Sequence, residues 1–220
     1  VEDEHGVTAM TSAGNFAASR AVVTLPLGVL KQRRVTFDPP LPAEKLGAIE
    51  RLGMNVLNRV YLRFPTAFWA ADATIQLGYI GENKGEWAAY FNFHHLTGAP
   101  VLLGFNAGAF GTRSETLSDD ELVAGMMAVL RRLYGPRIPN PEAALITRWL
   151  ADPFACGSYS HMTPGSTLAD RAALGQPIGD RLFFAGEATH VQYPSTVHGA
   201  YLSGLRAAQE VLAARETVTI

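Results

Sequence analysis

The residues best suited to chemistry lie in residues 182–204, LFFAGEATHVQYPSTVHGAYLSG. A short apolar run ends on a Gly-Glu pair at Glu187, and the hydroxyl residues Ser195 and Thr196 precede a predicted helix. A carboxylate at a strand end can accept hydrogen bonds from hydroxyls, and the free N–H groups of a helix N-terminus favour an acceptor oxygen or developing negative charge. The pattern also fits Glu187 in a solvated loop, with Ser195 or Thr196 as a simple helix cap.

The elements that would position these residues can be predicted from hydrophobic periodicity. Strands are predicted at residues 21–25, 55–64, 101–105, 144–150 and 182–185. Helices are predicted from Pro42 to Gly53, from a capping box at residues 118–121 to Gly135, and over residues 199–214. Residues 170–177 are predicted to form a loop with a short turn. The mixture favours an α+β fold, a mixed and largely antiparallel sheet with covering helices on one side.

Composition narrows the classes of function. The 220 residues are 48% hydrophobic and 17% charged, with a formal net charge of -2, which is typical of a globular protein. No basic field indicates a nucleic-acid partner, and no apolar run is long enough for a membrane span. No leader peptide is evident, and a cytoplasmic location is favoured. We expect no metal site, because HExxH and CxxC are absent and the adjacent His94 and His95 would point to opposite faces of a strand.

Three ordered blocks carry a resemblance to a known family. They are AVVTLPLGVLKQRRVTFDPPLP at residues 21–42, TRWLADPFACGSYSH at 147–161 and LFFAGEATHVQYPSTVHGAYLSGLRAA at 182–208. Together they resemble the flavin-dependent amine oxidase family, and polyamine oxidases and flavin-type histone lysine demethylases are the most similar members. The resemblance implies FAD as cofactor, a small-molecule amine as substrate, and oxidative deamination with peroxide formation.

The resemblance also implies roles for individual residues. It assigns FAD contacts to six of them: Pro26, Leu27, Trp149, Glu187, Thr196 and Val197. It makes Tyr159 an aromatic neighbour of the substrate amine, where a ring face attracts a cation. A core role for Trp149 and a buried, hydrogen-bonded Tyr159 are the structural alternatives.

Arg59 departs from the family pattern. It occupies a strand position where the family usually has a lysine that holds a water beside the flavin. Lysine can lose its proton in a dry site, whereas arginine effectively cannot. We therefore assign Arg59 to the catalytic residues with its role open. It could bind a substrate carboxylate, or it could be a harmless replacement.

The family's N-terminal dinucleotide-binding unit has no counterpart here, because no G-x-G-x-x-G is present. We expect residues 1–36 to form a remnant of the FAD-binding domain, residues 37–150 the substrate-binding domain, and residues 151–220 a return to the FAD-binding domain. The first strand and the last strand–helix unit should then pack together. The missing N-terminal FAD-binding segment would be a partner in cis or in trans, and we expect the isolated chain to be inactive. The alternative is a non-catalytic folded fragment, and a desaturase or porphyrinogen oxidase is a third interpretation.

Overall fold

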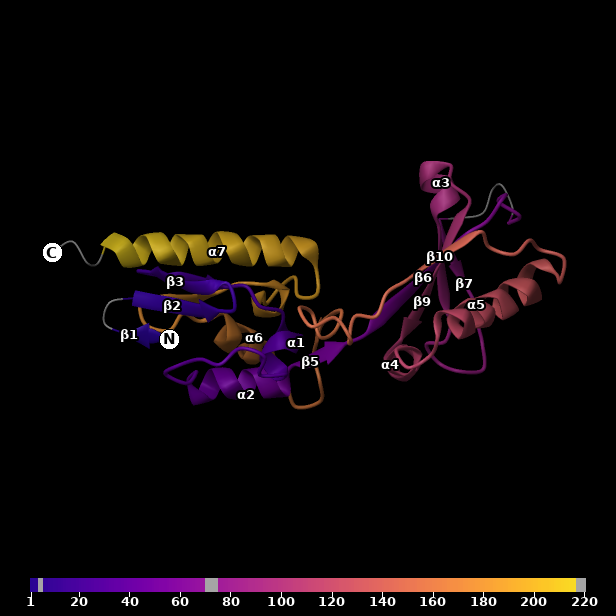
Figure 1. The fold of residues 1–220 in the computed structure, drawn as a ribbon. Helices are drawn as coiled ribbons and strands as arrows, with labels where there is room; N and C mark the ends of the chain where they lie inside the picture. The colour runs from indigo at the N-terminus through magenta and orange to yellow at the C-terminus, as the bar shows by residue number, and fades with distance from the viewer. Residues whose placement is uncertain (4–5, 70–74, 217–220) are drawn as a thin grey trace. The chain divides into compact units, whose positions relative to one another are not determined.

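A computed structural model describes residues 1–3, 6–69 and 75–216, which fall into two compact units (Figure 1). Unit 1 comprises Val1–Asn55 and Pro153–Ile220, and unit 2 comprises Val56–Asp152. The predicted α+β class with a largely antiparallel sheet is confirmed. Residues 37–55, which the sequence interpretation gave to the substrate-binding domain, belong to unit 1. The functional assignment of the two units stays a prediction.

The elements of unit 1 come from both ends of the chain. Its strands are β1 (Glu2–Asp3), β2 (Gly6–Thr11), β3 (Gly14–Ala18), β4 (Ala21–Val23), β5 (Gly53–Asn55), β11 (Tyr159–His161) and β12 (Leu182–Phe184). Its helices are α1 (Leu27–Lys31), α2 (Ala43–Arg51), α6 (Leu168–Gly175), α7 (Val197–Glu216) and the short 3-10 helix η1 (Glu187–Thr189).

Unit 2 is built on an antiparallel sheet with the strand order β10-β6-β9-β8-β7. Its strands are β6 (Leu57–Arg63), β7 (Gln76–Gly78), β8 (Ala89–Asn92), β9 (Val101–Ala107) and β10 (Ala143–Ile146). Its helices are α3 (Phe93–Thr97), α4 (Gly108–Ser114) and α5 (Asp119–Tyr134). The alternation predicted for β6 is confirmed, because Asn58, Val60 and Leu62 are buried while the residues between them are only half-buried.

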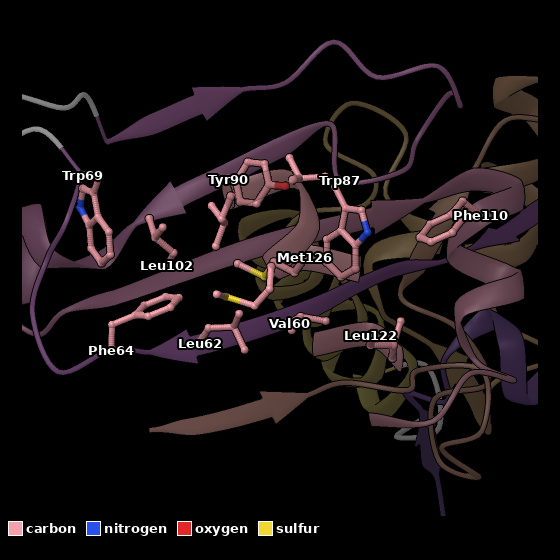
Figure 2. Packing of buried hydrophobic residues seen from close by; sticks show 13 residues of the cluster. Val60, Leu62, Phe64, Trp69, Trp87, Tyr90, Leu102, Phe110, Leu122 and Met126 are labelled. Carbon is pink, nitrogen blue, oxygen red and sulfur yellow. The ribbon is translucent and has the colours of Figure 1, made fainter. Parts of the chain in front are cut away.

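Helix α5 closes the core of unit 2 against the buried face of the sheet (Figure 2). It begins at the predicted capping box, where the Glu121 N–H donates to Ser118 Oγ at 3.2 Å and the Ser118 N–H donates to Glu121 Oε2 at 2.8 Å. Close approach of the helix requires Gly104 on β9. A Cβ at that position would lie 3.0 Å from Met126 Sδ and 3.1 Å from the Trp87 ring.

Strand β12 joins the two ends of the chain in unit 1. It pairs with β4 in parallel, with Leu182 opposite Ala21 and Phe184 opposite Val23. This pairing confirms that the first predicted strand packs beside the last one. Both Leu182 and Phe184 lie in a core cluster with Leu27 of α1, so the cluster places the end of β12 next to the start of α1.

The prediction of a loop at residues 170–177 is wrong, because α6 covers Leu168–Gly175. Its start is fixed by Asp170, whose Oδ2 accepts from the Thr167 N–H at 2.7 Å and whose Oδ1 lies 2.6 Å from Arg51 Nη2. The Arg51 and Thr167 hydrogen bonds hold the pKa of the Asp170 carboxyl below its usual range. The helix is only eight residues long and buries the charged residues Asp170 and Arg171, so its sequence does not show the purely apolar buried face expected of a helix.

Lys45 of α2, a buried lysine, caps the C-terminal end of α6. Lys45 Nζ donates to the carbonyl oxygens of Ala173, Leu174 and Gln176 at 3.0, 2.7 and 2.7 Å, and the side chain is 3% exposed. The Ala173 carbonyl also accepts from the Gln176 N–H at 3.3 Å, and the lysine supplies a donor to the two further carbonyls at the end of the helix. The ammonium also lies 3.8 Å from the centre of the Phe184 ring. Burial lowers the pKa of Lys45 to about 8.

Replacing Lys45 with methionine should lower the free energy of unfolding of unit 1 by about 2–3 kcal/mol, because three carbonyls lose the hydrogen bonds of a buried ammonium group. Lys31→Met is the matched control. Lys31 Nζ also donates to three carbonyls, those of Ile49, Glu50 and Leu52, but the side chain is exposed. Water can replace it there, so the loss should stay below about 1 kcal/mol. Urea denaturation followed by circular dichroism measures both, and equal losses would contradict the role given to burial.

Candidate functional site

One carboxylate organises the site in unit 1. Glu187 follows β12 directly, at the start of η1. Its Oε1 accepts from the Ser160 N–H at 2.8 Å, and its Oε2 accepts from Ser160 Oγ and from the Ser195 N–H, both at 2.6 Å. Glu187 therefore fastens β11 and the turn before α7 to the end of β12. Its predicted contact with a cofactor stays a prediction.

Arg171 of α6 supports this carboxylate from the interior. The side chain is 1% exposed, and one Nη1 donates to Ser160 Oγ at 2.7 Å and to the Ala188 carbonyl at 3.2 Å. The Ser160 hydroxyl therefore accepts from the Arg171 guanidinium and donates to the Glu187 carboxylate. Burial lowers the pKa of Arg171, and the negative charge of Glu187 opposes that shift. The two opposite charges compensate each other through one hydroxyl.

The turn before α7 has an unusual backbone conformation. Ser195 has a φ of 63°, which is uncommon for a residue other than glycine. Its N–H is held by Glu187, and its hydroxyl donates to the Ser160 carbonyl. The surrounding hydrogen bonds therefore hold the turn in place despite its backbone strain.

The turn delivers an open helix N-terminus. Thr196 Oγ1 accepts from the Gly199 N–H at 3.0 Å, so Thr196 is a helix cap, as one of the two interpretations held. The N–H groups of Val197 and His198 have no acceptor in the part of the chain that the structure describes. The Val197 side chain is 89% exposed. The start of α7 therefore presents free donors beside an uncovered apolar side chain.

The remaining predicted residues of unit 1 lie on α1 and β11. Pro26 is exposed and precedes α1, where its carbonyl accepts from the N–H groups of Val29 and Leu30 at 3.0 and 3.2 Å. Leu27 is 1% exposed and lies in the core, so Pro26 is the accessible one of the two residues, and the predicted cofactor contact of Leu27 stays a prediction. Tyr159 is half-buried on β11, and it points to the face opposite Ser160 because the two residues are adjacent in a strand.

The other two predicted residues, Arg59 and Trp149, belong to unit 2. The backbone N–H of Trp149 donates to Asn58 Oδ1 at 3.2 Å, and the backbone N–H of Arg59 donates to Thr147 Oγ1 at 2.9 Å. Both side chains are half-buried. The Arg59 Nε is buried without a hydrogen-bond partner among the described residues.

Two important residues escaped the sequence analysis. Ser160 lies inside the block at residues 147–161, but nothing in its spacing distinguishes it. Arg171 lies in the segment predicted to be a loop, and its partners Ser160 and Ala188 are 11 and 17 residues away. Neither a motif nor a period links residues at such separations.

Metal-binding clusters and membrane-spanning helices are both absent from the described residues. Over residues 1–3, 6–69 and 75–216, no cluster of three or more His, Cys, Asp or Glu side chains could hold a metal ion. In the same residues, no helix has both the length and the apolar character required to cross a membrane.

Comparison with known proteins identifies the family. The family model of flavin-containing amine oxidoreductases matches residues 2–212. The chain belongs to this family. Lysine-specific histone demethylase 1 homolog 2 of Arabidopsis thaliana is 41% identical over 213 residues, which cover 94% of this chain. The protein of the same name from Oryza sativa subsp. japonica is 40% identical over 220 residues, which cover 97%.

The fold of the family is also present in solved structures. Wild-type putrescine oxidase bound to putrescine matches 96% of the chain with a TM-score of 0.81 and 22% identity. The chain spans 28% and 29% of the two plant relatives and 46% of the putrescine oxidase chain. Membership in the family confirms the expectation of a flavin-dependent oxidoreductase.

The residues present in unit 1 fit a flavin. The pyrimidine edge of a flavin carries carbonyl oxygens and gathers negative charge on reduction. The free N–H groups of Val197 and His198, at the positive end of α7, are suitable donors to such an edge. The exposed Val197 side chain offers apolar surface to the ring.

Replacing Glu187 with glutamine should lower the free energy of unfolding of unit 1 by about 2–3 kcal/mol, because a donating amide then faces at least one of the three donors and Arg171 loses its countercharge. Glu44→Gln, an exposed change in the same unit, should cost less than about 0.5 kcal/mol. Chemical denaturation measures both variants. A Glu187→Gln protein as stable as the control would show that the carboxylate is not the fastening point.

Proposed function

We propose that this chain provides the flavin-ring side and the substrate-binding part of an FAD-dependent amine oxidase. The observation that carries the proposal is the open N-terminus of α7, with free N–H groups at Val197 and His198, held by Glu187 through Ser195. Family membership supports a flavin, and FAD is the form of it that we propose. When bound, FAD would accept a hydride from the carbon that bears the amine, and reoxidation by oxygen would yield hydrogen peroxide.

The residues of the chain would bind and orient the reactants. The N-terminus of α7 would donate hydrogen bonds to the pyrimidine edge of the ring and stabilise negative charge there. Backbone atoms of Pro26 and Leu27 would add contacts to the cofactor. The Tyr159 ring would attract the substrate ammonium group. Trp149 would contribute an apolar surface beside the ring.

The proposed reaction is oxidation at the carbon next to an amine nitrogen. The plant relatives are named as lysine-specific histone demethylases and the solved neighbour as a putrescine oxidase. An N-methylated lysine and a small alkyl amine share the carbon–nitrogen bond that such a reaction attacks. We propose a small-molecule amine as the substrate class.

We also propose that activity requires a dinucleotide-binding segment, in cis or in trans. Strands β4 and β12 form a two-stranded parallel sheet among the described residues. The outer edge of β12 is partly occupied, because Leu182 bridges Ile178 and the Phe184 carbonyl accepts from Arg206. Strand β4 has no strand neighbour other than β12 in that part of the chain, so its second edge is one at which a further strand can pair. The sequence contains no Gly-rich loop for a pyrophosphate. Without that segment the chain would be a folded but non-catalytic module.

Visible absorption spectroscopy tests the proposal. The chain is mixed with FAD, alone and together with a dinucleotide-binding segment, and a panel of alkyl, aromatic and N-methylated amines is added without oxygen. We expect a bound-flavin spectrum when the segment is present and bleaching by at least one amine. Peroxide release on admitting air is the second readout. A folded protein that binds flavin and is bleached by no amine would contradict amine oxidation.

Val197→Asp should weaken flavin retention by roughly tenfold, because a negative charge would face the electron-rich edge of the ring. The stability of the folded protein should not fall, because an acidic residue in the first turn stabilises a helix by about 0.3–1 kcal/mol. Leu212→Asp, at another exposed position of α7, is the control and should leave flavin retention unchanged. Equal retention in both variants, measured as flavin-to-protein absorbance after gel filtration, would refute the contact at Val197.

A further inference from the structure

The second face of the unit 2 sheet is lined by aromatic rings. Along the strand order β6-β9-β8, Leu103 lies between Tyr61 and Phe91, and Phe105 lies between Arg59 and Ala89. The rings form a continuous series. The centroid distances are 5.8 Å for Tyr61–Phe93, 6.4 Å for Phe91–Phe93 and 6.4 Å for Phe91–Phe105. Each of these rings is only half-buried, so the face retains open apolar surface.

Arg59 is the charged group at the centre of this face. Its guanidinium carbon lies 6.0 Å from the centre of the Phe105 ring. Its Nε is buried and has no hydrogen-bond partner among the described residues, and no ion pair involves Arg59 in that part of the chain. A half-buried cation without a countercharge is costly, and its N–H groups are directed donors that remain to be used.

The charges around Arg59 do not compensate it. Arg63, four residues along β6 on the same face, pairs with Glu142 at the rim, with Arg63 Nε 3.6 Å from Glu142 Oε2. The other residues that the strand pairing places on this face are Leu57, Tyr61, Gln76, Gly78, Ala89, Phe91, Val101, Leu103, Phe105, Ala107, Ala143 and Leu145. None of these is acidic, so the described strand residues give this face a net positive charge.

We infer that the aromatic face around Arg59 binds a carboxylate attached to an apolar body. A planar guanidinium can hold a carboxylate with two parallel hydrogen bonds, and the rings of Phe105, Phe91 and Tyr61 would pack against the apolar part. The same face disfavours a polycation, because a second ammonium group would meet Arg59 with like charge. Resting on the proposed function, this selects an amino acid over a polyamine as the substrate.

The binding can be measured without flavin or turnover. Benzoate and its neutral analogue benzamide are titrated into the 220-residue chain, and the Nε–H signal of Arg59 is followed by NMR. Arg59→Gln identifies that signal. We expect benzoate to shift the signal saturably and benzamide to bind at least about tenfold more weakly. Arg63→Gln, the control on the same strand and face, should keep the benzoate affinity within about twofold, as expected for an exposed charge.

Two outcomes would overturn the inference. One is equal affinity for benzoate and benzamide in the wild-type chain, which requires no variant to fold. The other is a benzoate affinity that Arg59→Lys and Arg59→Gln both leave unchanged. In the flavin-loaded protein, phenylalanine should reduce the flavin at a concentration at least about tenfold lower than 2-phenylethylamine, which lacks the carboxylate. If amines reduce the flavin but phenylalanine is not preferred over 2-phenylethylamine, the inference is contradicted and the proposed function is not. If the chain binds benzoate but no amine reduces the flavin, the proposed function is contradicted and the carboxylate site is not.

Discussion

The arrangement of unit 1 depends on the carboxylate of Glu187. It sits where β12 ends, and its three accepted hydrogen bonds fix Ser160 of β11 and the backbone of Ser195 before α7. A buried guanidinium, Arg171, compensates its charge through the Ser160 hydroxyl. The strained backbone at Ser195 persists because these bonds determine it. The open helix N-terminus is thus a consequence of one strand-end carboxylate.

Unit 2 follows a different physical logic. Strand β6 has one face committed to the core, where Val60 and Leu62 pack under α5, and another face that stays half-open with Arg59 and Tyr61. Because side chains alternate between the two faces of a strand, the residues that pack in the core and the residues on the half-open face are different ones. Stability comes from the buried face, so the residues on the other face can vary with the ligand. Arg59 lies on that half-open face, so the packing of the core does not determine which residue occupies the position.

Much of the fold could be predicted from the sequence, because strong periods and caps are local signals. The alternation of β6, the capping box at Ser118 and the short apolar strand β12 are of that kind. Residues joined by tertiary contacts could not be found. Arg171 and Ser160 have no motif, and α6 was missed because it is short and buries two charged residues, Asp170 and Arg171. Glu187 was identified as a site residue, but its bonds to Ser160 and Ser195 follow only from the fold. The assignments of Pro26, Leu27, Trp149 and Tyr159 rest on family resemblance.

The most direct test of this account is amide hydrogen exchange, residue by residue, in the protein with and without FAD. The N–H groups of Ser160 and Ser195 should be protected in both states, because Glu187 holds them. Those of Val197 and His198 should exchange rapidly without FAD and become protected when it binds. Protection of Val197 and His198 that does not change on saturation with FAD would contradict the claim that the start of α7 binds the flavin.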